Sequence, residues 1–174
     1  MDKIVIRGGK KLNGEISISG AKNAVLPIMA AALLGEEKSL IENVPNLRDV
    51  TTMVKLLRFL GAKVNHEGSK IEIKSGNNIK AVAPYHLVST MRASVCVLGP
   101  LLGRLQHAEV SMPGGCVIGA RPIDLHLKGL RALGGQLREN LVCFSYLVLH
   151  SLRSCAHCAN PSLMATAYRR WAGE

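Results

Sequence analysis

The 174-residue sequence predicts an α/β fold built from a repeated unit. Short runs in which apolar and polar residues alternate, typical of half-buried strands, are separated by longer apolar runs that end at glycine and are typical of helices. The composition is 48% hydrophobic and 20% charged, which is typical of a globular protein. No apolar run reaches the ~20 residues that cross a bilayer, and the first residues lack the pattern of a signal peptide. A cytoplasmic protein without membrane insertion is therefore expected.

The expected elements follow from local patterns in the first 135 residues. Alternation predicts strands over 3–7, 15–19, 39–42, the hairpin segments 63–64 and 70–74, and 109–112. Apolar spacing predicts helices over 24–34, 46–60, 84–102 (one helix or two) and 123–133. Gly35 and Gly61 follow the first two helices, as C-terminal stops do. Asn46 is in position to cap the second helix, and Asp49 lies in its first turn.

The same order of landmarks occurs twice, which indicates an internal repeat. The paired landmarks are 33–35 with 101–103, Pro45 with Pro113, and 57–61 with 130–134. The second copy is five residues longer, and the extra residues fall within 113–122. An insertion into one copy of a repeat is a place where a functional loop is expected.

The segment 113–122 contains three glycines between flanking prolines, which is typical of a lid over an active site. Cys116 lies among these glycines. A cysteine is most often a small buried apolar residue, but a glycine-rich loop favours a thiol that donates a proton or acts as a nucleophile. Arg121 could hold an anionic substrate, although most arginines are solvated charges. Pro122 at a first helical position would leave the next backbone N–H groups free for a phosphate.

A second candidate site lies where the strand expected over 15–19 meets the first helix. Lys22 and Asn23 lie in the segment 19–23 that joins the strand to that helix, and Lys22 places a cation at the helix N-terminus. The segment lacks the complete P-loop pattern, which argues against a nucleoside triphosphatase. Arg92 has a comparable place in the second copy, where the alternative is a charge whose stem covers apolar surface.

The composition changes near Gly135. The first 135 residues contain 11 Lys and 11 Ile, whereas the last 39 contain neither and hold three of the five cysteines. A frameshifted reading of the same gene would produce this change, and so would a short terminal extension that uses arginine. Cys155 and Cys158 form an isolated C-x-x-C pair without a second pair at zinc spacing, so no metal site is expected.

The net charge of +10 favours an anionic partner. A basic nucleic-acid-binding module is one alternative. Such modules usually place aromatic residues among the basic ones so that bases can stack. The first 135 residues contain only Phe59 and Tyr85 as aromatics, so no nucleic-acid partner is expected.

Together these stretches resemble the N-terminal portion of the UDP-N-acetylglucosamine 1-carboxyvinyltransferases, a family of enolpyruvyl transferases. The matching stretches are 3–9, 14–27, 91–94, 98–101 and, most specifically, 113–126. The resemblance implies an inside-out α/β barrel of repeated βαβαββ units, with the active site between two domains. Residues 1–21 would belong to one domain and 22–135 would form two repeats of the other. Residues 136–174 would be an atypical tail, read out of frame.

The resemblance also implies an activity, the first committed step of peptidoglycan synthesis. The enolpyruvyl group would pass from phosphoenolpyruvate to the 3-hydroxyl of UDP-N-acetylglucosamine, with release of phosphate. Cys116 would protonate the methylene carbon of phosphoenolpyruvate and could form an adduct with it, and Lys22 and Asn23 would contact this substrate. Arg92 and a second group of residues would contact UDP-N-acetylglucosamine: Arg121, Pro122, Ile123, Asp124 and Leu125.

The resemblance implies no cofactor and leaves the oligomeric state open. Because the family's general base has no counterpart in the matched residues, this chain is expected to be inactive alone. A related alternative is a 3-phosphoshikimate 1-carboxyvinyltransferase, which shares the fold and the phosphoenolpyruvate chemistry. The lid with Cys116 is not expected in that enzyme.

Overall fold

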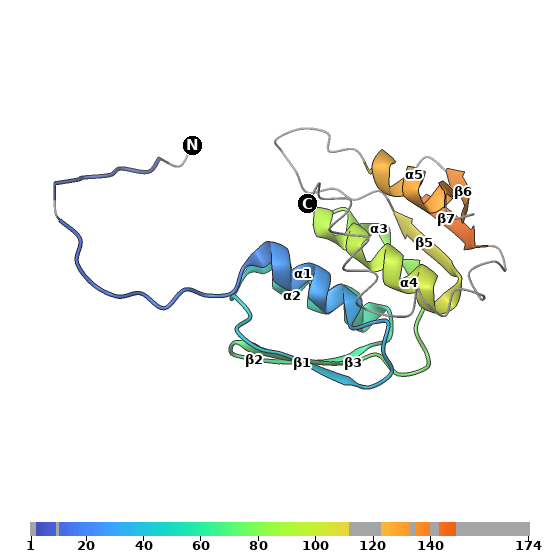
Figure 1. Ribbon diagram of the computed structural model, residues 1–174, viewed down its shortest axis with the longest axis horizontal. Helices are drawn as coiled ribbons and strands as arrows, with labels where there is room; N and C mark the ends of the chain where they lie inside the picture. Colours follow the sequence, from blue (N-terminus) through green and yellow to red (C-terminus); the bar gives the residue numbers. More distant parts are fainter. Residues whose placement is uncertain (1–2, 10, 112–122, 133–134, 140–142, 149–174) are drawn as a thin grey trace.

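The computed structural model describes residues 3–9, 11–111, 123–132, 135–139 and 143–148 (Figure 1). The first structural unit contains two helices and a three-stranded sheet: α1 (Lys22–Ala31), β1 (Lys38–Ile41), α2 (Arg48–Phe59), β2 (Lys63–Glu67) and β3 (Lys70–Lys74). The strand order is β1-β3-β2, and both pairings are antiparallel. β2 and β3 form the predicted hairpin.

The second unit begins with a two-residue strand and contains a four-stranded sheet. Its elements are β4 (Val82–Ala83), α3 (Tyr85–Val88), the 3₁₀ helix η1 (Arg92–Val97), α4 (Leu98–Leu105), β5 (His107–Ser111), α5 (Asp124–Ala132), β6 (Gly135–Glu139) and β7 (Cys143–Val148). The strand order is β4-β5-β7-β6. β4 runs parallel to β5, and the other neighbours are antiparallel.

The two units share one topology, as the paired landmarks predict. β1-α2-β2-β3 corresponds to β5-α5-β6-β7, and in each unit the last strand lies between the first two in the sheet. The second unit differs by having β4 on the outer edge of β5.

The core lies between the helices and one face of the first sheet. Ile71 and Ile73 of β3 are fully buried, whereas Lys74 on the opposite face is exposed. α2 buries an apolar stripe on the other side of this core: Val50, Met53, Val54, Leu56 and Leu57. Burying each such side chain stabilises the fold by about 1.5–3 kcal/mol. Figure 1 shows α1 and α2 together over one face of this sheet.

The N-terminal segment differs from its prediction, because 3–7 and 15–19 form no strand. Its apolar side chains are exposed, Ile16 at 87% and Ile18 at 84%. Figure 1 shows the segment extending away from the rest of the chain. A strand needs a neighbour to accept its hydrogen bonds, and no described strand lies beside these residues.

Two helix predictions also need correction. The second helix begins at Arg48 after Leu47, so Asn46 does not cap it, and Asp49 is the acidic residue of its first turn. The segment 84–102 forms three short helices rather than one or two, because Met91 adopts an extended conformation that separates α3 from η1.

The strands β6 and β7 lie almost entirely within 136–174, the segment predicted to be an atypical tail. β7 pairs with β5 from Cys143 to Leu147. The loss of Lys and Ile after Gly135 does not show whether the following residues can form strands. Phe144, Tyr146 and Val148 are of the aromatic and β-branched types that favour strands. An out-of-frame origin of the tail stays a prediction. None of the helices among the described residues is long and apolar enough to cross a membrane.

Candidate active site

The start of α1 carries two of the predicted site residues, Lys22 and Asn23. The residue before them, Ala21, is the N-cap and has no side-chain oxygen to accept from the first-turn N–H groups. The first turn contains no acidic residue either. Because these N–H groups give a helix N-terminus a partial positive charge, this end of α1 suits an anionic ligand.

Lys22 forms an ion pair with an acid that we did not predict as a site residue. Its Nζ lies 2.9 Å from Oδ2 of Asp49 in the first turn of α2, and the two side chains are 47% and 34% exposed. An ion pair this exposed contributes only about 0–1 kcal/mol. A negatively charged ligand can therefore compete with Asp49 for Lys22. The sequence contains one signal for Asp49, its position in the first turn of a predicted helix, and that signal does not point to a ligand site.

A close contact holds the backbone just before α1. The backbone N–H of Gly20 donates to Oδ1 of Asn43 at 3.2 Å. A Cβ on Gly20 would lie 2.1 Å from the carbonyl oxygen of Asn43, so only glycine fits. Asn43 itself has a φ of 56°, a left-handed conformation that asparagine tolerates better than most residues.

Asn23 has an unusual main-chain carbonyl. In a regular helix this oxygen accepts from the N–H four residues later, but the residue there is Pro27, which has no N–H. The carbonyl of Asn23 therefore lacks its helical donor. It can accept a hydrogen bond from a ligand or from water.

Arg92 is the first residue of η1, which packs against α1. Within the described part of the chain, its guanidinium makes no ion pair or hydrogen bond. Burial raises the pKa of the Cys96 thiol on the same 3₁₀ helix, and the charge of Arg92 opposes this shift. Arg92 and Lys22 thus lie on neighbouring elements, and each carries a positive charge.

The start of α5 carries three further predicted residues. The side chain of Ile123 is buried at 5% exposure, so any contact with a ligand would use its main chain. Asp124 and Leu125 are exposed, and Asp124 lies in the first turn of the helix. Leu125 is an unusually exposed apolar side chain, at 58%.

The other predicted residues, Cys116, Arg121 and Pro122, lie outside the described residues. Their roles stay predictions. Across the ranges that the structure describes, no group of His, Cys, Asp and Glu side chains could hold a metal ion.

Comparison with protein families gives one match that covers most of the chain. A family model described as EPSP synthase (3-phosphoshikimate 1-carboxyvinyltransferase) matches residues 6–146.

Curated relatives share much of the sequence over a third of their own length. UDP-N-acetylglucosamine 1-carboxyvinyltransferases from Sorangium cellulosum and Trichlorobacter lovleyi are 58% and 56% identical over 138 residues, which is 79% of this chain and 33% of each relative. The enzyme of that name from Dichelobacter nodosus is 53% identical over 148 residues, which is 84% of this chain and 35% of the relative.

Solved structures support the fold. The enolpyruvyl transferase NikO from Streptomyces tendae superposes with a TM-score of 0.68 at 22% identity and covers 81% of this chain and 31% of that protein. An EPSP synthase from Acinetobacter baumannii gives a TM-score of 0.53 at 17% identity over 76% of this chain and 32% of its own. The described units thus form part of the inside-out α/β fold that the family resemblance implied.

Proposed function

Because the chain belongs to the EPSP synthase (3-phosphoshikimate 1-carboxyvinyltransferase) family, we propose that it supplies part of an enolpyruvyl transferase acting on UDP-N-acetylglucosamine. The observation that carries the proposal is the 53–58% identity to relatives named UDP-N-acetylglucosamine 1-carboxyvinyltransferase. The reaction would transfer the enolpyruvyl group of phosphoenolpyruvate to the sugar 3-hydroxyl and release phosphate. This step would serve peptidoglycan synthesis in the cytoplasm.

In this proposal Cys116 protonates the methylene carbon, which makes the adjacent enol carbon electrophilic. The sugar hydroxyl then attacks that carbon and gives its proton to a general base, which the rest of the enzyme would supply. In a second step the methyl carbon loses a proton as phosphate leaves, which restores the double bond of the enolpyruvyl group. Lys22 and Asn23 bind phosphoenolpyruvate, which the uncapped N-terminus of α1 and the weakly held ion pair with Asp49 support. Competition by an anion would release Lys22 toward the substrate.

UDP-N-acetylglucosamine would bind through Arg92 and the start of α5. Arg92 is a cation that makes no ion pair within the described ranges, which suits a diphosphate. The exposure of Asp124 and Leu125 suits contacts with a sugar nucleotide. Arg121, Pro122 and the main chain of Ile123 would complete this set.

We also propose that residues 1–21 belong to a second domain and that 22–135 form two repeats of the first. The exposed Ile16 and Ile18 support this, because alternating apolar residues in water are expected to pair with a further sheet. The family stabilises its transition state in a closed cleft between domains, where cations are aimed at one phosphate. The chain alone would therefore be inactive.

A fusion protein tests the proposal directly. The 138 residues of this chain that match the Sorangium cellulosum relative at 58% identity would replace the matched region of that protein. We expect phosphate release that requires both phosphoenolpyruvate and UDP-N-acetylglucosamine, and loss of at least a hundredfold in turnover in the Cys116→Ala fusion, since general acid catalysis contributes about 10²–10⁴. The unfused chain should show no release above its own Cys116→Ala variant.

Two results would contradict the proposal. A folded fusion without activity, beside an active parent relative, would show that this segment cannot perform the chemistry. Release with shikimate 3-phosphate but not with UDP-N-acetylglucosamine would favour the alternative acceptor, which the description of the family model also names.

A further inference from the structure

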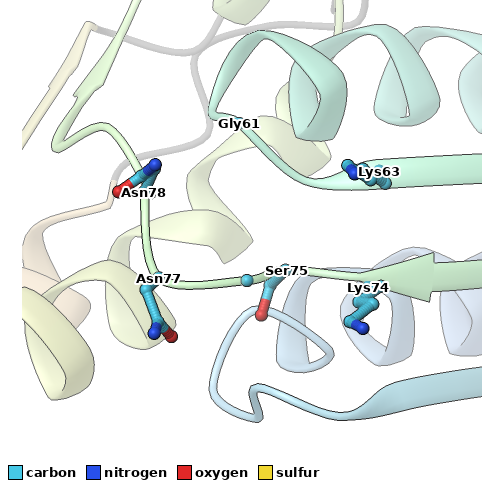
Figure 2. Close-up of a pocket in the computed structure, with 7 residues that line it drawn as sticks. Gly61, Lys63, Lys74, Ser75, Asn77 and Asn78 are labelled. Carbon is cyan, nitrogen blue, oxygen red and sulfur yellow. The ribbon is translucent and has the colours of Figure 1, made fainter.

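A solvent-open pocket lies at one end of the first sheet (Figure 2). Its walls come from Gly61 after α2, from Lys63 on β2, and from Lys74 with the loop 75–78 after β3. Its volume is about 200 Å³, several times the ~30 Å³ that one water occupies. The pocket can hold a small ligand, and no acidic side chain lines it.

The pocket is remote from the candidate active site. Asn43, just past the end of β1, touches Gly20 at the start of α1. Lys74 instead pairs with Lys38 at the other end of β1. The ten residues of α1 span about 15 Å between these two ends. A ligand in the pocket would therefore not touch Lys22 or Asn23.

Two like charges face each other at the pocket. Lys63 and Lys74 are direct partners in the β2–β3 register, so their side chains are on the same face of the sheet. Like charges placed opposite one another are destabilising. Lys38, in the same row, is neutralised by Glu72 at 2.6 Å. Neither Lys63 nor Lys74 has an ion pair within the described ranges, so two positive charges are left uncompensated.

Hydrogen bonds and a close backbone contact hold the loop 75–78 that forms one wall of the pocket. Arg104 donates to Oγ of Ser75 at 2.7 Å and to the carbonyl of Gly76. On the other side Gly61 has a φ of 106°, and a Cβ there would lie 2.5 Å from the carbonyl oxygen of Asn78. The backbone of the loop is thus fixed before any ligand arrives.

Two amide side chains remain available on this fixed loop. Asn77 and Asn78 line the pocket, are exposed, and make no side-chain hydrogen bond to other described residues. Each amide NH₂ group offers two donors. The pocket therefore combines two ammonium groups with several neutral donors, which is the chemistry that recognises an oxyanion.

We propose that this pocket binds a phosphate-class oxyanion, free or carried on a small metabolite, at a site separate from the candidate active site. Lys63 and Lys74 supply the charge, and Asn77 and Asn78 donate hydrogen bonds. A phosphate fits the pair of lysines better than a carboxylate, because a phosphate monoester carries about 1.5–2 negative charges at neutral pH and a carboxylate carries one. Lysines bind phosphate as point charges.

The test is an NMR titration of the full chain, labelled with ¹⁵N, with inorganic phosphate in one arm and glucose 6-phosphate in the other. Sodium chloride keeps the ionic strength constant. We expect saturable shifts of the backbone amides of 74–78 and of Lys63 in at least one arm, and an apparent Kd raised at least tenfold in the K63Q/K74Q variant. Saturation by phosphate alone identifies the free ion, and tighter binding of the ester identifies a metabolite.

The matched control is Lys55→Gln, which removes one charge from the exposed side of α2, outside the pocket. It should leave the apparent Kd unchanged. The proposal is overturned if neither arm saturates, if chloride alone gives the same shifts, or if Lys55→Gln weakens binding as much as Lys63→Gln or Lys74→Gln. If K63Q/K74Q does not fold, the apparent Kd values of Lys63→Gln and Lys74→Gln are compared with that of Lys55→Gln instead.

Discussion

Replacing Arg104 by methionine should uncouple the two structural units. Arg104 lies near the end of α4 in the second unit, and its side chain is only 12% exposed. One Nη donates to the carbonyl of Leu33 at 2.9 Å and to Oγ of Ser75 at 2.7 Å, and the other donates to the carbonyl of Gly76. The guanidinium also donates to the carbonyl of Gly35 at 3.4 Å and lies 3.8 Å from Oε1 of Glu36. All of these partners belong to the first unit or to the loop that follows it.

The cost in unfolding free energy follows from the loss of these interactions. Methionine fills much of the same space but donates no hydrogen bond, so each acceptor would lose a partner. Hydrogen bonds contribute about 0.5–1.5 kcal/mol each, and more from a charged donor, whereas removing a buried charge recovers part of its desolvation. We expect Arg104→Met to lower the free energy of unfolding by about 3–5 kcal/mol. Arg104→Lys should lose less, because one ammonium group can still reach part of the set.

Urea denaturation of the full chain, followed by circular dichroism, measures this free energy. The control is Arg48→Met at the exposed start of α2, where the side chain has no hydrogen bond within the described residues. It should change the free energy by less than about 0.5 kcal/mol. A loss below about 1 kcal/mol in Arg104→Met, or an equal loss in the control, would refute the reasoning.

Three further predictions concern the core and the candidate active site. Gly20→Ala should cost about 1–3 kcal/mol of unfolding free energy, because its Cβ would lie 2.1 Å from the Asn43 carbonyl oxygen; Gly99→Ala, with no atom within 4 Å, is the control, and equal losses would contradict the claim. Ser94→Ala should be neutral or stabilising in thermal unfolding, since the buried Oγ has no hydrogen-bond partner among the described residues; a clear fall in Tm would count against this. Cys96 should react with iodoacetamide more slowly in the folded chain than in urea at neutral pH, and faster as pH rises, because burial raises its thiol pKa and reduces the thiolate fraction. Equal rates in both states, measured by mass spectrometry, would disprove it.

Local sequence patterns were sufficient to predict the helices and hairpins that form between residues close together in the chain. The apolar spacing of α2 and the hairpin of β2 and β3 are contained in short windows of sequence, and both are confirmed. The prediction of strands over 3–7 and 15–19 was wrong, because a strand also depends on a pairing partner distant in the sequence. Alternation shows that a segment suits a sheet, but it does not show which strand will pair with it.

In the candidate active site, too, features set by neighbouring residues could be predicted, and contacts between distant residues could not. Lys22 and Asn23 were placed correctly at a helix start, because the apolar run and the small residues before it are adjacent in sequence. The ion pair with Asp49 was missed, since it joins two helices that only the fold brings together. The hydrogen bonds of Arg104, which reach 71 residues back along the chain to Leu33, had no local signal at all.

The separation between Arg104 and its acceptors has a consequence for folding during synthesis. The first sheet closes on itself between Lys38 and Lys74, so its contacts span short stretches of chain and should form quickly. Because the ribosome releases the N-terminal side first, this sheet can assemble with α1 and α2 before α4 emerges. The carbonyls of Leu33 and Gly76 would then stay hydrated until the guanidinium of Arg104 arrives. The hydrogen bonds of Arg104 would then stabilise a first unit that has already folded. The second unit depends on this folded first unit for the surface against which it packs.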